Sequence, residues 1–139
     1  MTESAPIPTI EEFLACCDAA CEFLVREHGF ERLPAPREHN PYSVRFRKGA
    51  LGVDVYGESY GQAASCDLLR GEVRLDLGLL VPAAQRQAPR RKGPRPGQLA
   101  QIQTIAARLK LHAADFLQGE TGRFETAWRS GRASRGRAR

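Results

Sequence analysis

The fold is decided by residues 42–58, which read YSVRFRKGALGVDVYGE. Apolar side chains recur at every second position on both sides of Gly49, as in Val44 and Phe46 before it and Val53 after it. This alternation is typical of strands with one buried face, and a glycine between two such runs is typical of a turn. Residues 42–58 therefore predict a β-hairpin with one apolar face and one polar face.

The same pattern continues downstream of the hairpin. Residues 64–69 and 73–80 alternate again, and the turn sequence Arg70-Gly71-Glu72 separates them. Short alternating runs with short connections favour neighbouring antiparallel strands. The four runs together predict a four-stranded antiparallel meander.

Helical spacing flanks the meander on both sides. Thr9 and Glu12 have the spacing of a capping box, and a stripe of apolar residues follows as far as Gly29. A second stripe runs over residues 97–119, and a short helix is expected at about 121–130. The prediction is an α+β fold with an N-terminal helix, the meander, and a long and a short C-terminal helix. Because each helix has one apolar stripe and the sheet one apolar face, the helices should pack on one face of the sheet.

The chain divides into one domain, which includes a basic loop, and two terminal segments. Its 139 residues suit a single domain, which we place at 9–130. Residues 1–8 are expected to be frayed, residues 81–96 to form a mobile basic loop, and residues 131–139 to be a disordered arginine-rich tail. The N-terminus does not read as a secretory signal, and no apolar run reaches the length of a membrane span, so we expect a cytoplasmic protein.

Positive charge is concentrated in two segments. The formal net charge is +5, but residues 86–95 and 129–139 hold five basic residues each and no acid. The other 118 residues keep 11 basic and all 16 acidic side chains, a net charge of −5. The basic pI therefore comes from the appendages, and an acidic domain suits a basic protein partner.

The polar face of the predicted sheet is the first candidate for a binding surface. Arginine and tyrosine are enriched among the residues that anchor protein interfaces, whereas opposite charges across strands also stabilise a solvated sheet. Partner-binding and purely structural readings both remain open for this face. Its candidate residues are Arg45, Arg47, Asp54, Tyr56, Asp67, Arg74 and Asp76.

The basic segments give an alternative function, in which the protein associates with nucleic acid. Flexible arginines and lysines can neutralise phosphates without reading sequence. Neither segment carries an aromatic residue for base stacking, and no known nucleic-acid-binding motif accompanies them. The residues that would bind phosphate are Arg86, Arg90, Arg91, Lys92, Arg95, Arg132, Arg135, Arg137 and Arg139.

Catalysis and metal binding have little support in the sequence. His112 and Asp115 are spaced as a helical pair, but no nucleophile or phosphate-binding motif accompanies them. Cys16, Cys17 and Cys21 lie together without a second cysteine or histidine pair at zinc-ligand spacing. The sequence therefore predicts a protein that is not an enzyme and needs no cofactor or metal.

Three stretches of the chain resemble a known group of proteins. They read FLVREHGF at 23–30, YSVRFRKGALGVDVYGES at 42–59 and LKLHAADFLQGETGRFETAW at 109–128. Over residues 9–130 this pattern resembles small bacterial α+β proteins, some of which look like immunity proteins encoded beside polymorphic toxins. The resemblance implies a stoichiometric binder of one toxin domain, whose contact residues vary and cannot be transferred. We therefore expect a non-enzymatic protein-binding module of the immunity type that occludes a cognate toxin.

Overall fold

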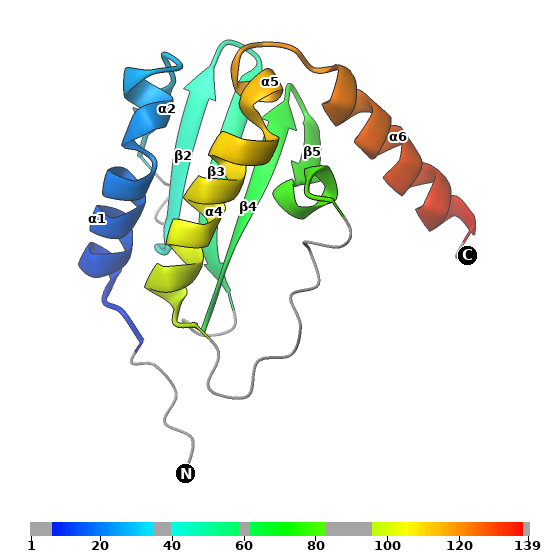
Figure 1. Ribbon diagram of the computed structural model, residues 1–139. Coiled ribbons are helices and arrows are strands. Elements are labelled where there is room, and N and C mark those ends of the chain that lie inside the picture. Colours follow the sequence, from blue (N-terminus) through cyan, green and yellow to red (C-terminus); the bar gives the residue numbers. More distant parts are fainter. Residues whose placement is uncertain (1–6, 35–39, 59–61, 83–95, 138–139) are drawn as a thin grey trace.

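The computed structural model describes residues 7–34, 40–58, 62–82 and 96–137, with side chains described as far as residue 131. One antiparallel sheet forms its centre, with the strands side by side in chain order, β1-β2-β3-β4-β5 (Figure 1). The strands are β1 (Glu31–Leu33), β2 (Ser43–Lys48), β3 (Leu51–Glu58), β4 (Ala63–Arg70) and β5 (Val73–Asp76). The helices are α1 (Ile10–Ala20), α2 (Glu22–Arg26), the 3₁₀ helix η2 (Leu77–Leu80), α4 (Gln98–His112), α5 (Ala114–Leu117) and α6 (Gly122–Arg137).

The α+β class and the antiparallel meander are confirmed, but the predicted number of strands is wrong. β1 is a fifth strand, and it pairs with β2 at the start of the meander. It spans three residues directly before Pro34, which is too short to show alternation. Arg32 of β1 forms an ion pair with Asp18 of α1, which holds this edge strand against the helix layer.

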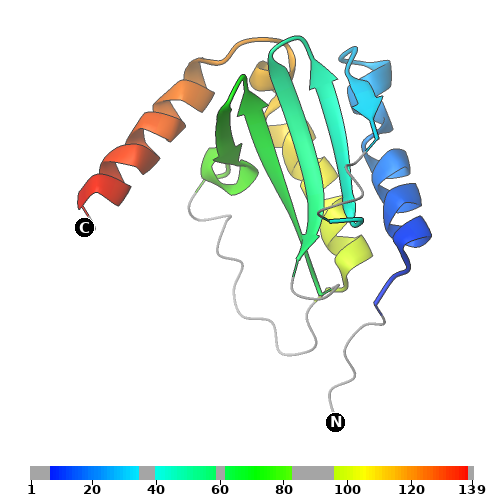
Figure 2. The ribbon, with the colours of Figure 1, turned by 180° about the vertical axis from the view of Figure 1, so that it is seen from behind.

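Helices α1 and α4 lie on the same side of the sheet (Figure 1). The view from behind shows strands that no described helix covers, a surface we call the open face (Figure 2). Side chains between the sheet and the helices form the core, and those from the middle strands alternate as the sequence predicts: Val44, Phe46, Val53, Val55, Cys66, Leu68 and Leu75 are all buried. The sheet therefore has one face in the core and one face uncovered by the described helices.

Both predicted long helices are shorter than expected, because each is interrupted once. The first breaks at Cys21 and the second at Ala113, two residues that are themselves fully buried. After the first break Phe23 is buried, at 7% exposure, whereas Val25 of the predicted apolar stripe is 45% exposed. The break thus turns the last helical residues so that the larger aromatic side chain enters the core.

Helix ends follow the predicted signals. The backbone N–H of Glu12 donates to the hydroxyl of Thr9 at 3.1 Å, and the N–H of Thr9 donates to the Glu12 carboxylate at 2.9 Å, which completes the capping box. Gly29 has a φ of 75°, and the N–H of Phe30 then donates to the carbonyl of Leu24 at 2.9 Å. The start of α1 and the end of α2 are therefore confirmed.

Four of the predicted segment limits differ from those in the structure. Strand β5 ends at Asp76 instead of residue 80, because Asp76 caps η2 by accepting from the N–H of Gly78 at 2.7 Å. Val81 is buried although the basic loop was predicted to begin there, and Pro8 is buried within the predicted frayed end. The carbonyl of Pro8 accepts from the Tyr42 hydroxyl at 3.0 Å, which ties this residue to the start of the meander.

The fourth correction concerns the C-terminal helix. α6 continues to Arg137, beyond the predicted end near residue 130 and into the predicted disordered tail. It is anchored by its first turns, where Phe124 stacks on Phe116 with ring centroids 5.1 Å apart and Glu125 pairs with Arg70. Figure 1 shows α6 leading away from the sheet on the β5 side. Among the described helices, none has the length and hydrophobicity needed to span a membrane.

Candidate interaction surface

The strand register brings the predicted candidate residues together on the open face. Arg45, Asp54, Asp67 and Asp76 lie directly opposite one another on β2, β3, β4 and β5. In the next row, Arg47 and Arg74 are opposite Gly52 and Leu69, and on the other side Tyr56 is opposite Ser43 and Ser65. The face therefore presents three rows of mostly polar side chains. The middle row contains three carboxylates, those of Asp54, Asp67 and Asp76.

Two carboxylates on this face are buried. Asp54 is 6% exposed and Asp67 is 7% exposed, although no described helix covers them. Like charges directly opposite each other in a sheet are destabilising, and buried charges need partners. The charged neighbours of Asp54 and Asp67 must therefore offset both the repulsion between the two carboxylates and the cost of burying them.

Two arginines supply that compensation. Arg74 spans the pair, donating to Asp67 Oδ2 at 2.8 Å and to Asp54 Oδ2 at 3.0 Å, and Arg47 donates to Asp54 Oδ1 at 2.7 Å. These bonds to Asp67, together with the nearby carboxylate of Asp54, raise the pKa of Arg74 against the opposing effect of its partial burial. The result is a network of guanidinium and carboxylate groups drawn from four strands.

A glycine makes room for one of these ion pairs. A Cβ atom added at Gly52 would lie 2.7 Å from Nη1 of Arg47, which is too close for any real contact. Arg47 therefore reaches Asp54 by lying across a position of β3 that has no side chain. The sequence alternation places Gly52 on the polar face, but it does not reveal this crossing.

Tyr56 belongs to the same network. Burial is the largest cause that raises the pKa of its phenol, followed by the charge of Asp67 and a hydrogen bond to that carboxylate. The phenol thus stays protonated and donates to Asp67 at neutral pH. Tyr56 holds the carboxylate from the side opposite to Arg74.

A shallow hollow of about 330 Å³ opens over this network. Cavities of a few hundred Å³ are the size at which small ligands or single partner side chains begin to fit. Five of the lining residues are among the predicted candidate residues, and Asn40 and Ser43 are not. The lining consists of Asn40, Ser43, Arg45, Asp54, Tyr56, Asp67 and Arg74.

Asn40 and Ser43 shape the rim of the hollow. The Asn40 side chain accepts from the N–H of Tyr42 at 3.0 Å and donates to the carbonyl of Gly57 at 2.9 Å. The Ser43 hydroxyl donates to the carbonyl of Asn40 at 2.7 Å. The Asn40-Pro41 dipeptide is a turn signal that could have predicted this local structure, but not its place beside the charged network.

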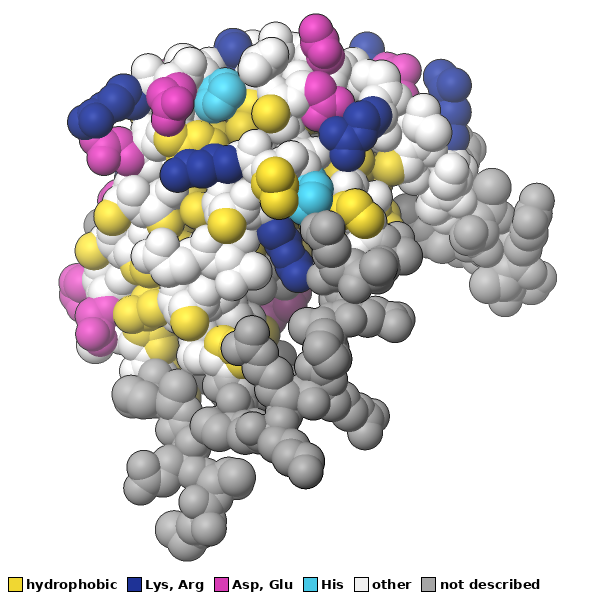
Figure 3. Space-filling model, in the orientation of Figure 1, with side chains coloured by type: hydrophobic (Ala, Val, Ile, Leu, Met, Phe, Trp, Pro, Cys, Tyr) yellow, Lys and Arg dark blue, Asp and Glu magenta, His cyan; other side chains and the backbone are white. Residues whose placement is uncertain are grey.

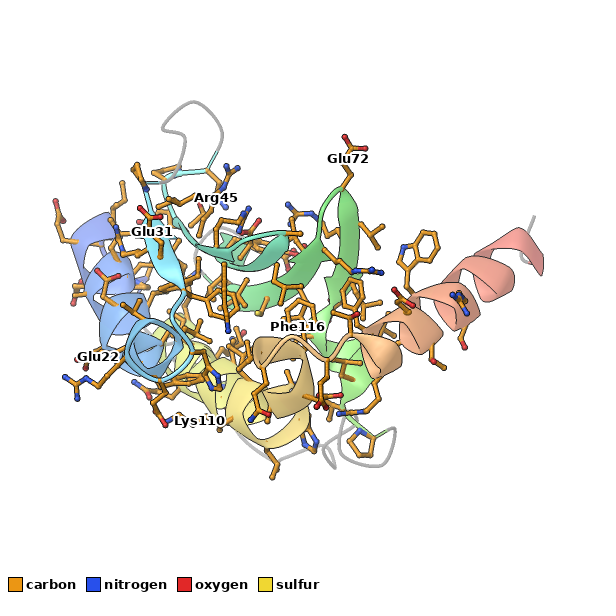
Figure 4. The ribbon with its side chains drawn as sticks, turned by 90° about the horizontal axis from the view of Figure 1, so that it is seen from above. Glu22, Glu31, Arg45, Glu72, Lys110 and Phe116 are labelled. Atoms are coloured by element: carbon orange, nitrogen blue, oxygen red, sulfur yellow. The ribbon has the colours of Figure 1, made fainter. Side chains whose placement is uncertain are left out.

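Arg45 differs from the other arginines of the face. It is half-buried in the lining of the hollow, and no described carboxylate lies within salt-bridge distance of its guanidinium. Figure 4 shows it pointing away from the helix layer, on the side of the sheet opposite to Lys110 of α4. Figure 3 shows the helix-covered side, where basic and acidic side chains are scattered among exposed hydrophobic ones.

The remaining candidates are not assembled into a site. Asp115 accepts from Arg123 at 3.1 Å, and the structure gives it no hydrogen bond to His112. Burial raises the pKa of the Cys21 thiol to about 12, and that of Cys66 well above its ordinary value, which disfavours reactive thiolates. Within the described ranges, no group of three or more potential ligands could hold a metal ion.

The basic candidates are described only in part. Arg86, Arg90, Arg91, Lys92 and Arg95 lie outside the described residues, as does Arg139. Positions 132, 135 and 137 belong to the backbone of α6, but their side chains are not described. The structure therefore brings together the polar-face candidates and leaves the phosphate-binding candidates untested.

Comparison with known proteins gives no further guide. No protein-family model matches this chain, and neither a curated protein nor a solved structure is significantly similar to it.

Proposed function

We propose that this protein is a non-enzymatic protein-binding module of the immunity type, which occludes a cognate toxin domain through its open face. The observation that carries the proposal is the charged network over Asp54 and Asp67 on a sheet surface that no described helix covers. Solvated sheet faces commonly carry exposed, loosely paired charges, whereas here two carboxylates are more than nine-tenths buried.

A prearranged surface of this kind favours binding. Side chains that already hold one another lose less conformational freedom when a partner docks. Arginine and tyrosine, which form the walls of the hollow, are also the residue types most enriched at binding hot spots. The net charge of −5 outside the two basic segments would attract a basic partner such as a nuclease domain.

A steric pair of variants tests whether the open face is the docking surface. The tagged full-length chain is used to capture partners from its native host, and a captured toxin is purified for measurement of its stoichiometry, its affinity and its inhibition. Ser65→Arg adds bulk to the open face beside Tyr56, and Ala107→Arg adds the same side chain to the exposed side of α4. We expect the first variant to weaken 1:1 binding and inhibition at least tenfold and the second to leave both unchanged.

Two results would overturn this proposal. One is capture of no toxin that binds the purified chain, and the other is equal affinity for the Ser65→Arg and Ala107→Arg variants. Circular dichroism of both variants controls for folding.

Nucleic-acid association is the second candidate function, and the extent of α6 favours it. Residues 129–137 of this helix contain arginines at 129, 132, 135 and 137 and no acidic residue. A basic helix leading away from the body could lie along a phosphate backbone, with an affinity that falls steeply with salt. Deletion of 129–139 with neutralisation of 86–95 should then abolish retention on DNA and RNA, and unchanged retention would exclude this function.

A further inference from the structure

Arg45 is the arginine of the open face that has no described ion-pair partner. The buried carboxylates are bound by the other two arginines of the face, Arg47 and Arg74. Both oxygens of Asp54 accept from Arg47 and Arg74, and Arg74 also takes one oxygen of Asp67. The guanidinium of Arg45 therefore lines the hollow without a described salt bridge.

The other described carboxylates of the face form no ion pair with Arg45. Glu58, on β3, accepts from the Ser65 hydroxyl at 2.9 Å. Asp76, at the β5 margin, uses an oxygen to cap η2. Glu31, on β1, is opposite Arg47 in the register, is exposed, and lies beyond salt-bridge distance from Arg45. The described surroundings of Arg45 thus include polar neighbours, Asn40 and Ser43, and two aspartates that are bound by other arginines, but no carboxylate within salt-bridge distance.

The other polar groups of the hollow are already committed. Asn40, Ser43 and Tyr56 each donate to a group of the protein itself, and both buried aspartates accept from arginine. A cationic ligand would meet carboxylates that are taken and an arginine that repels it. The group of the hollow that remains available to a ligand is the guanidinium of Arg45, with its N–H donors.

We propose that the hollow on the open face receives a carboxylate side chain, Asp or Glu, from the protein partner, paired to the guanidinium of Arg45. This inference rests on the proposed function and supplies the chemistry of its contact. The planar guanidinium matches a carboxylate with two parallel hydrogen bonds. A phosphate fits less well, because its nearly double negative charge would stand beside Asp54 and Asp67.

Local contact and long-range attraction involve charges of opposite sign in this complex. A basic toxin would be drawn to the acidic domain as a whole, since steering depends on the summed charge. Its acidic anchor would then occupy one position, beside the guanidinium of Arg45. A partly desolvated pair of this kind is typical of residues that control dissociation more than association.

Model peptides test the chemistry before any partner is known. The full-length protein, labelled with ¹⁵N, is titrated with N-acetyl-Ala-Glu-Ala-amide, with the matching Lys peptide, and with the matching phosphoserine peptide. We expect saturable shifts at the Arg45 Nε–H and at the amides of Ser43 and Tyr56 with the Glu peptide, at a Kd on the order of millimolar. The Lys peptide should give no shift at these groups.

Variants assign the response to one side chain. Arg45→Gln should reduce the Glu-peptide response at least fivefold, and Arg26→Gln, an exposed arginine of α2, should leave it unchanged. No response to the Glu peptide, a response that survives Arg45→Gln, or tighter binding of the phosphoserine peptide would overturn the inference. If the Glu peptide bound only to the Glu38→Gln variant, the partner of Arg45 would be this chain's own Glu38. That result would overturn the inference as well.

Once a partner has been captured, its affinity for the two variants tests the inference and the proposed function separately. Arg45→Gln should then weaken the complex by about tenfold, and a double-mutant cycle should identify the partner's Asp or Glu. If Ser65→Arg abolishes the complex while Arg45→Gln leaves its affinity unchanged, the inference fails and the docking surface stands. If the partner binds both variants as tightly as the unmodified chain, both fail.

Discussion

The two faces of the sheet are stabilised by different physics, although the same strands form both. On the helix-covered face, residues such as Val53 and Leu68 are fully buried, and the free energy comes from removing apolar area from water. On the open face, Asp54 and Asp67 are nearly as buried, but they are held by directional bonds to arginine. Burial by itself therefore does not tell a core from a binding surface, whereas the chemistry of the buried groups does.

The largest expected effect distinguishes two neighbours on one strand. Leu68→Ala removes a fully buried side chain from the core and should lower the free energy of unfolding by about 2–5 kcal/mol. Leu69→Ala changes the next residue of β4, which is partly exposed on the open face, and should cost about 1 kcal/mol or less. Urea unfolding of both variants checks the contrast, and equal losses would contradict the division between the faces.

The next effect concerns the arginine that bridges the aspartates. Arg74→Met leaves Asp54 and Asp67 opposite each other without their shared cation, and its cost is reduced because Arg74 is half exposed. We expect a loss of about 1–2 kcal/mol in the free energy of unfolding. The loss should shrink when Asp67→Asn is already present, since the two side chains are coupled.

The control for the Arg74 variant is Arg26→Met, which removes an exposed ion pair on α2. Unfolding in urea should place it within about 0.5 kcal/mol of the unmodified chain. A loss equal to that of Arg74→Met would mean that the network is no more than an ordinary surface ion pair.

A smaller effect should come from the glycine beneath Arg47. Gly52→Ala places a methyl group 2.7 Å from Nη1 of Arg47, so that the guanidinium must shift and its bond to Asp54 should weaken. The expected cost is about 1 kcal/mol, the size of one charge-assisted hydrogen bond partly exposed to water. Gly122→Ala is the matched control, because a Cβ atom there meets nothing within 4 Å. Thermal unfolding should separate the two variants, and equal melting temperatures would argue against the crossing of Arg47 over β3.

The smallest effect is a dependence on alkaline pH. Because the pKa of Tyr56 is raised in the folded protein, the unfolded chain releases this proton first, at about pH 10. The free energy of unfolding should therefore fall as pH rises above 10, and Tyr56→Phe should remove part of this fall. Urea unfolding of both proteins at pH 8 and pH 10.5 measures the difference. A difference that does not change with pH would contradict the role assigned to the phenol.

The sequence predicted the elements with a regular period and missed those without one. Alternation located β2, β3 and β4, and the capping box and Gly29 located the ends of the first helical region. β1 has three residues, and η2 has the apolar composition of a strand, so neither carries a period that identifies it. Leu79 shows the consequence: alternation places it in the core, and the 3₁₀ turn leaves it 42% exposed.

The candidate surface was predicted as a set of residues but not as an arrangement. Alternation alone placed Arg45, Asp54 and Tyr56 on one face, because successive side chains of a strand point to opposite sides. It could not show that two aspartates would be buried there. That result depends on Arg47 reaching over Gly52 and on Arg74 spanning two strands.

By itself, the sequence determined the fold class, the middle strands of the meander, the two helical regions and the membership of each sheet face, because these follow from local periods and end signals. The tertiary structure alone decided the fifth strand, the breaks at Cys21 and Ala113, the burial of Asp54 and Asp67, and which arginines of the open face pair with them. The physical reason is that strand pairing, helix packing and ion pairing are contacts between distant parts of the chain. No local period records which partner a side chain will meet.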